Sequence, residues 1–445
     1  MKNIFKLAIL ALAILPMCLM TSCDQNNGFE LTDGVPVIKY IRPQDVAAKD
    51  SLLTEAYLGS SLTIVGENLT SIKEMYFNDQ AAVLNTSYIT YNTMLVTVPK
   101  NIPGEVKDMI IMITKDGQEV TYPFHVAVPG PVVNSMACEH VKAGEEAIIY
   151  GQYFVDDPNV PLTITFTGEQ RSHNVVVPNE NIKEITQSSI RFVVPEDAVM
   201  GQVQVATVYG SALSKFYFRD KRNVITDFDG AAHAGSETGI VPQGWNLKPT
   251  YLEENGVDGF YCQIGPATTT GDDWVEDLKL SFWAGNWNGD PMSIQKGEAG
   301  VPIRNCYDMS DWQNMSFKME LCIPSSNPWS AGALQIIFVN NQQCANDSWQ
   351  NNTYIHTSAN GGLDLPRALY RPWAATGSYD TGDQWITVTI PLTDFIYNDD
   401  GTKSPKMMSE QSFDSFIMWP KDGGVAGTEC TPIFRYDNLR IVPNL

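Results

Sequence analysis

The tryptophans are the residues of this chain whose type and placement could do chemistry. All ten follow residue 244, and many stand beside glycine, asparagine, proline or aspartate, as in Trp283-Ala284-Gly285-Asn286-Trp287. Such neighbours are typical of loops, where a large indole is difficult to bury completely. An exposed indole offers a flat apolar plate to the C–H face of a sugar ring, and amide or carboxylate side chains nearby can bind the hydroxyls at the rim. The distribution therefore predicts a carbohydrate-binding surface in the second half of the chain.

Six aromatic side chains are the candidates for direct contact with a glycan. They are Trp287, Trp329, Trp349, Trp373, Trp283 and Tyr370. The alternative for each of them is burial in a core. We expect burial for Trp385, which begins an alternating strand pattern, and for Trp312, which precedes another. The sequence does not decide between the two roles for Trp245, Trp274 and Trp419.

No catalytic motif accompanies these aromatic residues. A jelly-roll glycosidase of the laminarinase type would carry Glu-x-Asp-x-x-Glu on one strand, and no glutamate of this chain is followed by aspartate two residues later. The five histidines are dispersed without an HExxH motif, and neither a nucleophile elbow nor a Walker sequence occurs. We therefore expect binding without cleavage and no catalytic residue. A jelly-roll hydrolase or lyase with carboxylates from separate strands is the first alternative, and a structural adhesin with purely core tryptophans is the second.

Charge and cysteine placement restrict the partners. The net formal charge of −22 repels phosphate backbones, so nucleic acid is not an expected partner. The cysteines form no close CxxC pair, and no EF-hand-like spacing occurs, so we expect no cofactor and no metal site. A structural calcium ion held by loop carboxylates stays an unsupported alternative. Cys322 lies in a strand-like apolar run, where we expect a buried thiol.

The beginning of the chain has the pattern of an export signal. Lys2 and Lys6 precede an apolar stretch that is too short to span a membrane stably. The stretch ends in Met20-Thr21-Ser22-Cys23, which resembles a bacterial lipoprotein signal, whose cysteine is acylated. The resemblance implies a signal peptide at residues 1–22, lipidation at Cys23 and a flexible tether at residues 23–35. An ordinary signal peptide is the alternative.

The rest of the chain has the pattern of an all-β protein, with short β-rich runs between clusters of glycine, proline, asparagine and aspartate. Residues 36–129 (module 1) and 130–220 (module 2) contain a degenerate repeat whose landmarks lie about 85 to 96 residues apart, close to the length of an immunoglobulin-like domain. The strand-Gly-x-Asn-Leu pattern ending at Leu69 resembles the IPT/TIG family of immunoglobulin-like modules, although module 2 carries Tyr153 in place of the asparagine. Residues 221–445 (the C-terminal domain) predict a jelly-roll-like β-sandwich.

Together, the lipoprotein signal, the tandem modules and the tryptophan-rich sandwich resemble a Bacteroidetes surface glycan-binding protein of the B type. The resemblance implies capture of a polysaccharide by a C-terminal domain related to the xyloglucan-binding domain, with the immunoglobulin-like modules as spacers. It also implies a lipid-anchored position on the outer membrane, exposed at the cell surface, beside a TonB-dependent transporter and its SusD-like partner. A β-linked glucan such as xyloglucan is the first expected ligand. Family members bind glycan with surface tryptophan and tyrosine, and only this residue type is carried over to the loop aromatics above.

Overall fold

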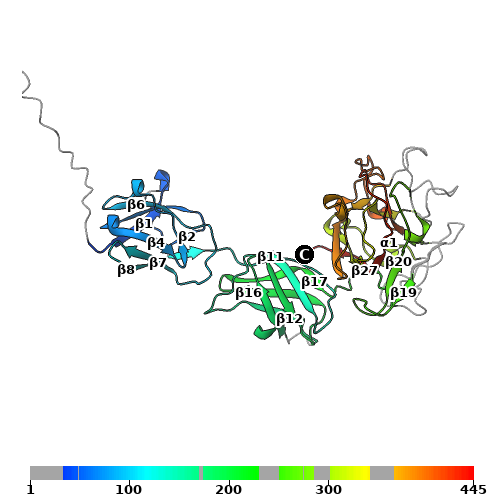
Figure 1. The fold of residues 1–445 in the computed structure, drawn as a ribbon, viewed down its shortest axis with the longest axis horizontal. Coiled ribbons are helices and arrows are strands. Elements are labelled where there is room, and N and C mark those ends of the chain that lie inside the picture. Colours follow the sequence, from blue (N-terminus) through cyan, green and yellow to red (C-terminus); the bar gives the residue numbers. More distant parts are fainter. Residues whose placement is uncertain are drawn as a thin grey trace, which may run out of the picture. The chain divides into compact units, whose positions relative to one another are not determined.

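The structure is a computed structural model that describes residues 34–48, 50–169, 174–229, 250–273, 275–284, 301–340 and 365–445. Strands dominate these ranges, so the prediction of an all-β chain is confirmed (Figure 1). The chain divides into two compact units that meet in sequence between Pro129 and Gly130. None of the helices in the described ranges has the length and apolar character that a membrane span requires. The predicted signal peptide and Cys23 lie outside the described residues.

Helical structure is confined to single turns among the described residues. They are α1 (Ile303–Cys306), η1 (Val46–Ala48), η2 (Leu69–Ser71), η3 (Thr86–Tyr88), η4 (Asn179–Asn181), η6 (Glu276–Leu278), η7 (Trp312–Asn314), η9 (Pro372–Ala375), η10 (Leu392–Asp394) and η11 (Glu410–Ser412).

Module 1 packs two antiparallel sheets around one apolar core. The first sheet has the order β1 (Val37–Pro43), β3 (Ser61–Glu67) and β6 (Thr93–Thr97), and the second has the order β5 (Gln80–Ala81), β4 (Ile72–Phe77), β7 (Met109–Thr114) and β8 (Glu119–Pro123). A short parallel pair joins β2 (Glu55–Tyr57) to β9 (His125–Ala127). Alternate residues of each strand, such as Ile110 and Met112 of β7, enter the core because successive strand side chains point to opposite faces.

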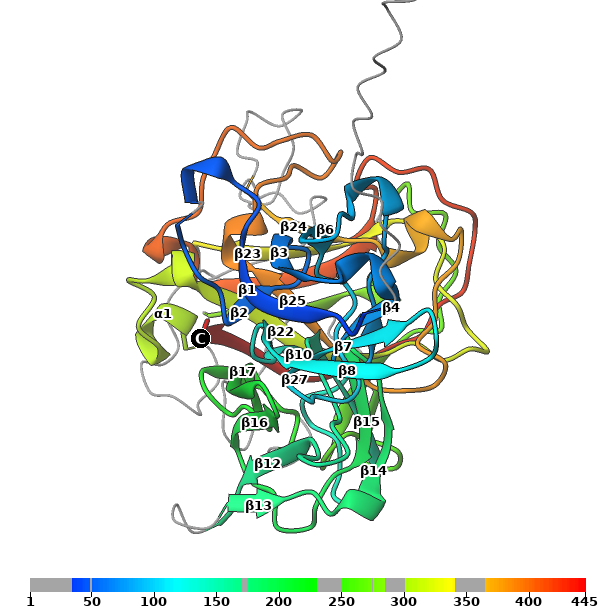
Figure 2. The same ribbon diagram turned by 90° about the vertical axis from the view of Figure 1, so that its left-hand side faces the viewer.

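Module 2 repeats this two-sheet arrangement. Its first sheet has the order β10 (Val132–Met136), β11 (Glu146–Gln152), β15 (Ser189–Val193) and β14 (Ile182–Ile185). Its second sheet has the order β13 (Asn174–Val176), β12 (Thr163–Thr167), β16 (Gly201–Thr207) and β17 (Gly210–Phe218), and Figure 2 labels the strands of this second sheet. Its core is richer in phenylalanine than that of module 1, and Phe166 lies with its ring centroid 5.0 Å from that of Phe218.

The glycine of the repeated sequence pattern, Gly66 in module 1 and Gly151 in module 2, is required by the same backbone geometry in both modules. A Cβ atom at Gly66 would lie 2.0 Å from the carbonyl oxygen of Val37, and a Cβ atom at Gly151 would lie 2.0 Å from that of Val132. Only glycine permits this approach. Two residues later the chain is left-handed in both modules, with φ of 55° at Asn68 and 59° at Tyr153. Asparagine adopts this conformation more readily than tyrosine, which explains the asparagine of the family pattern and makes Tyr153 the less favourable residue at this position.

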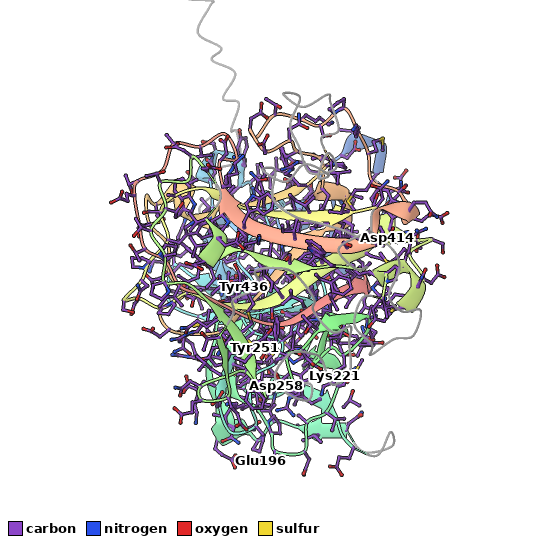
Figure 3. All side chains as sticks on the ribbon, turned by 90° about the vertical axis from the view of Figure 1, so that its right-hand side faces the viewer. Glu196, Lys221, Tyr251, Asp258, Asp414 and Tyr436 are labelled. Atoms are coloured by element: carbon purple, nitrogen blue, oxygen red, sulfur yellow. The ribbon has the colours of Figure 1, made fainter. Side chains whose placement is uncertain are left out.

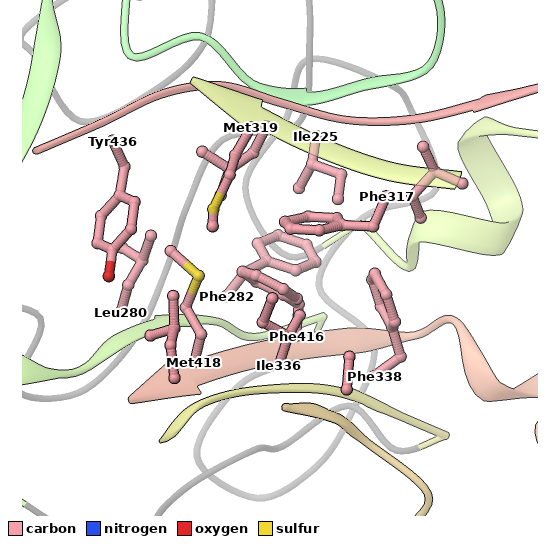
Figure 4. Packing of buried hydrophobic residues seen from close by; sticks show 14 of the residues in the cluster. Ile225, Leu280, Phe282, Phe317, Met319, Ile336, Phe338, Phe416, Met418 and Tyr436 are labelled. Carbon is pink, nitrogen blue, oxygen red and sulfur yellow. The ribbon is translucent and has the colours of Figure 1, made fainter. Parts of the chain in front are cut away.

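The C-terminal domain is a sandwich of two sheets. The β27 sheet has the order β19 (Thr250–Leu252), β20 (Tyr261–Ile264), β27 (Phe434–Pro443), β22 (Met315–Cys322) and β25 (Ile386–Pro391), with β18 (Val224–Thr226) also paired to β27. The β23 sheet has the order β21 (Leu280–Phe282), β26 (Ser415–Lys421), β23 (Ala333–Val339) and β24 (Ala368–Tyr370). The core lies between them, where Phe317 of β22 meets Phe416 of β26 at a ring distance of 5.7 Å (Figure 4).

The outer face of β22 carries charge, and module 2 covers it. The sequence Met315-Ser316-Phe317-Lys318-Met319-Glu320 alternates apolar residues for the core with polar residues for the outer face. Glu139 of module 2 accepts hydrogen bonds from Lys318 Nζ at 2.5 Å and from Arg440 Nη2 at 2.8 Å, and Arg440 Nη1 donates to Glu320 at 2.6 Å. All four charged side chains are buried. Each therefore depends on its partners, because an isolated buried charge is strongly unfavourable.

A second contact joins module 2 to the C-terminal domain. His140 Nδ1 lies 3.4 Å from Asp258 Oδ2, and Asn438 Nδ2 donates to Asp258 Oδ1 at 2.8 Å. Figure 3 shows Asp258 beside Lys221. Burial pushes the pKa of Asp258 upward, but the hydrogen bonds from His140 and Asn438 outweigh it and lower that pKa to about 2.

Candidate functional site

The outer face of the β23 sheet carries an apolar cluster that is separate from the core between the sheets. Residues of β23 and β26 that do not face the core turn to this side: Ile337 and Val339 from β23, and Ile417 and Trp419 from β26. Trp283 joins them immediately after the end of β21. Both faces of this sheet are thus apolar, whereas a sandwich sheet usually presents a polar outer face. We name these five residues the outer cluster.

Two indoles dominate the outer cluster. Trp419 lies on β26 itself, two residues after Ile417, and Gln335 of β23 stands directly opposite it in the ladder. Trp283 follows β21, which pairs with β26 on the side away from β23. Trp283 is 6% exposed and Trp419 is 3% exposed. Leu365 packs against the cluster. The sheet therefore carries two indoles on one face, and both are nearly as buried as the core tryptophans.

Two polar atoms on this face are buried and have no hydrogen-bond partner among the described residues. They are Nε1 of Trp419 and Oγ of Ser281. Ser281 lies opposite Ile417 in the ladder, and its neighbours Leu280 and Phe282 face the core, so Ser281 faces the outer cluster. An unsatisfied buried donor costs about 1–3 kcal/mol. Native proteins rarely keep such groups without a reason, and a ligand rich in hydroxyl groups would supply both the acceptor and the donor that are missing.

Fully paired polar side chains hold the neighbouring strands. Arg367 Nη1 donates to Gln335 Oε1 at 2.7 Å, and Gln335 Nε2 donates to the carbonyl oxygen of Lys421 at 2.8 Å. Lys421 Nζ donates to Asp399 Oδ2 at 3.2 Å. These side chains are buried or nearly so. Their bonds are satisfied within the protein, so they fix the geometry of the face, in contrast to Trp419 and Ser281.

Two segments beyond the described residues begin or end at this face. Ala284, next to Trp283, precedes residues 285–300, and Asn340 and Leu365 flank residues 341–364. The candidate plates Trp287 and Trp349 belong to these two segments and lie outside the described residues, as do Trp245 and Trp274. The sequence therefore returns to the outer cluster at both places where it carries a candidate loop tryptophan.

The structure corrects the expectation that the loops of Trp329 and Trp373 expose them. Trp329 is 0% exposed and Trp373 is 3% exposed, and both belong to the core between the sheets. The main chain at Trp329 pairs with Tyr379, and Trp329 Nε1 donates to the carbonyl oxygen of Ala331 at 2.7 Å. Trp373 Nε1 donates to the carbonyl oxygen of Gly332 at 2.9 Å. Backbone acceptors in the loops themselves allow these indoles to be buried, so neither presents an exposed plate.

Three further aromatic side chains of the C-terminal domain are partly buried. Tyr370 is half-buried at the end of β24, with its ring centroid 6.2 Å from that of Trp329, and burial raises the pKa of its hydroxyl. Trp312 is partly buried against the core, which agrees with the expectation for it. Trp385, expected in the core, is only half-buried; its Nε1 donates to the carbonyl oxygen of Asn255 at 3.0 Å and its ring contacts Tyr261.

Sequence reasoning left Trp419 undecided and did not single out Ser281. A signal for Trp419 was present: in Ser415-Phe416-Ile417-Met418-Trp419 every position from 416 to 419 is apolar, which is the pattern of a strand with two apolar faces. Cys322 is a buried thiol, as expected. Within the described ranges no group of three histidine, cysteine, aspartate or glutamate side chains is arranged to hold a metal ion.

Comparison with known proteins gives concordant matches. Residues 218–443 match the family model described as surface glycan-binding protein B xyloglucan binding domain. A curated relative, an IPT/TIG domain-containing protein from Bacteroides ovatus, is 28% identical over 285 residues, which cover 61% of this chain and 57% of the relative. The chain thus spans little more than half the length of that relative. The crystal structure of surface glycan-binding protein PbSGBP-B from Prevotella bryantii is similar with 37% identity and a TM-score of 0.77, covering 93% of this chain and 100% of that one.

Proposed function

The chain belongs to the surface glycan-binding protein B family, and from this premise we propose that its C-terminal domain captures a β-linked glucan on the outer face of the β23 sheet. Xyloglucan is the first ligand to test, because the family description of residues 218–443 names it. Membership in this family confirms the resemblance inferred from the sequence and the expectation of a cell-surface protein that binds glycan rather than cleaving it.

One observation carries the choice of this face. The outer cluster combines two indoles with a buried, unpartnered indole N–H and a buried, unpartnered hydroxyl. The indoles match the apolar face of a sugar ring, and the two polar atoms match its hydroxyl rim. A purely structural face would gain stability if these atoms were paired or absent. Their retention is explained if a hydroxyl-bearing ligand completes them.

The loop tryptophans extend the proposed site. Trp287 follows Trp283 by four residues, and Trp349 lies in the segment between Asn340 and Leu365. The described residues that flank both segments lie at or beside the outer cluster, so we propose Trp287 and Trp349 as further residues to test for glycan contact. A row of such plates binds a chain of sugars at low entropic cost because indole has few rotatable bonds.

The position in the cell is part of the proposal. Acylation of Cys23 would anchor the chain to the outer membrane, and several acyl chains on one residue suffice for stable anchoring. A TonB-dependent transporter and a SusD-like protein would receive the captured glycan. Cys23→Ala should release the full chain from membranes into the soluble fraction. If the variant still sediments with membranes after a salt wash, another anchor holds the protein.

Affinity electrophoresis of the mature full chain tests the glycan site. Xyloglucan, mixed-linkage glucan and charged polygalacturonan would be cast into parallel gels. We expect the neutral glucans to retard the protein and polygalacturonan not to, with no new reducing ends over hours of incubation. Trp283→Ala should abolish most of the retardation, whereas Tyr57→Ala, at a tyrosine of module 1 that is 70% exposed, should leave it unchanged. Equal retardation of the parent and Trp283→Ala would remove the outer cluster as the site.

A further inference from the structure

Module 2 has a hollow on the outer face of its β13-β12-β16-β17 sheet. Figure 2 labels these four strands. The volume of the hollow is about 480 Å³. Its floor and walls include Thr165 and Thr167 of β12, Gln202 and Gln204 of β16, and Tyr217 of β17. These side chains share the outer face because their strand neighbours, such as Phe166 and Val203, enter the core of the module. The hollow is separate from the outer cluster of the C-terminal domain.

No charged side chain is among the described residues that line this hollow. In a chain with 18% charged residues and a net charge of −22, an uncharged lining stands out, because exposed protein surfaces are ordinarily about 25–35% charged. The exposed Lys215 of β17 is not part of the lining and donates to Asn134. Ions and charged polymers gain nothing from such a surface. A neutral ligand avoids the cost of desolvating a charge when it binds there.

The lining supplies both kinds of contact that a sugar needs. Threonine hydroxyls and glutamine amides can each donate and accept hydrogen bonds. Apolar surface comes from Leu213, which is 55% exposed, from Met200, which is 37% exposed, and from the ring of Tyr217. The sheet ladder sets Thr165, Gln204 and Leu213 in one row across three strands. Polar and apolar groups therefore lie side by side in the hollow.

Tyr217 is held rigidly at one end of the hollow. The guanidinium of Arg222 lies 4.3 Å from the centroid of the Tyr217 ring. Arg222 is fixed in turn by Asp220 at 2.8 Å and by the carbonyl oxygen of Pro443 in the C-terminal domain at 3.3 Å. An aromatic ring that is already immobilised loses little entropy when a ligand stacks on it. The same contacts tie this end of the hollow to the C-terminal domain.

We propose that this hollow is a second, weaker binding site for the same neutral polysaccharide. The inference rests on the proposed function for the identity of the ligand, but not for the site itself. Two sites joined through Arg222 and Pro443 would act on one long glycan chain as a bivalent receptor. The consequence is a preference for polymer: a chain that reaches both sites is held more tightly than an oligosaccharide that fills only one.

Variants of the mature full chain separate the two sites. Tyr217→Ala removes the ring, and Gln204→Glu places a charge in the hollow at constant size. Each should lower the affinity for xyloglucan polymer roughly 10-fold or more and leave the affinity for a short xylogluco-oligosaccharide at the outer cluster unchanged. Tyr150→Ala is the matched control, because Tyr150 is 44% exposed on β11 of the opposite sheet. Hydrogen exchange should show polymer-dependent protection of β12, β16 and β17.

The Trp419→Ala background makes the outcome decisive. Polymer binding that survives in Trp419→Ala and disappears in Trp419→Ala with Tyr217→Ala supports the second site. If Tyr217→Ala and Gln204→Glu both bind polymer like the parent and no protection appears on β12, β16 and β17, the second site does not exist, and the proposed function stands without it. If instead Trp419→Ala binds polymer normally while Tyr217→Ala does not, the hollow is a site and the outer cluster is not.

Discussion

Tryptophans of the inner pair, Trp329 and Trp373, and Trp419 of the outer pair are buried to nearly the same extent but differ in their hydrogen bonds. In the core between the sheets, Trp329 and Trp373 donate their indole N–H groups to the carbonyl oxygens of Ala331 and Gly332. On the outer face of the β23 sheet, Trp419 is 3% exposed and its N–H has no acceptor among the described residues. Burial alone therefore does not distinguish a core tryptophan from a binding tryptophan. Whether the indole N–H has a hydrogen-bond acceptor does distinguish them.

The largest expected effect is on the stability of the inner pair. Trp329→Ala should lower the free energy of unfolding by about 3–5 kcal/mol, because it leaves a large cavity in the core. Chemical denaturation followed by circular dichroism measures this change. Variant protein that remains folded should bind glycan as the parent does. A Trp329→Ala protein with parental stability and lost binding would reverse the assignment of the two pairs.

The next effect is on the affinity of the outer pair. Trp419→Ala should reduce the binding free energy for xyloglucan oligosaccharide by about 1–3 kcal/mol, as removal of a central aromatic anchor does at other interfaces. Isothermal titration calorimetry gives the value, and Tyr57→Ala serves as the exposed control. Should Trp419→Ala bind oligosaccharide as tightly as the parent, the unpaired indole N–H needs an explanation other than a ligand.

Asp437 is a buried carboxyl group whose protonation should make the stability of the protein depend on pH. Asp437 Oδ2 has no partner, and burial together with the charges of Asp258 and Glu320 raises the pKa of this carboxyl well above its usual range. A raised folded-state pKa gives a stability contribution that is complete below about pH 3.9 and is lost as the pH rises through the folded pKa. Each unit of elevation corresponds to about 1.4 kcal/mol.

Asp437→Asn imitates the protonated form at every pH. We expect the variant to match the parent near pH 4 and to be the more stable protein at pH 8. Thermal unfolding from pH 4 to pH 8 checks this. A constant difference between the two proteins over that range would show that Asp437 does not change its protonation state there.

The smallest and sharpest effect comes from removing the indole N–H alone. Trp419→Phe removes a donor that has no acceptor, so stability should fall only by the packing lost with the smaller ring, while glycan affinity drops by about 0.5–1.5 kcal/mol. Trp329→Phe is its counterpart, because it also leaves the carbonyl oxygen of Ala331 unsatisfied, at a cost of about 1–3 kcal/mol. Equal losses of stability in the two phenylalanine variants would erase the distinction between the pairs.

The sequence predicts the strands well because their side chains alternate. The run Met315 to Glu320 shows which residues of β22 face the core, and the repeated glycines show the two modules. The fate of the loop tryptophans is not predictable in the same way. Whether Trp329 is buried depends on its pairing with Tyr379 and on the local carbonyl of Ala331. The partners of Glu139 lie about 180 to 300 residues away in the chain, so no local pattern in the sequence reveals them.

The Glu139 contact also decides how deletion experiments on this protein should be interpreted. A fragment that begins at residue 221 keeps every strand of the C-terminal domain, yet it removes the carboxylate that neutralises Lys318 and Arg440. Loss of glycan binding in such a fragment would then result from misfolding. A deletion experiment would wrongly attribute that loss to a binding role of module 2. Recombinant fragments for crystallography or interaction screens should therefore begin no later than Gly130, where the compact unit begins.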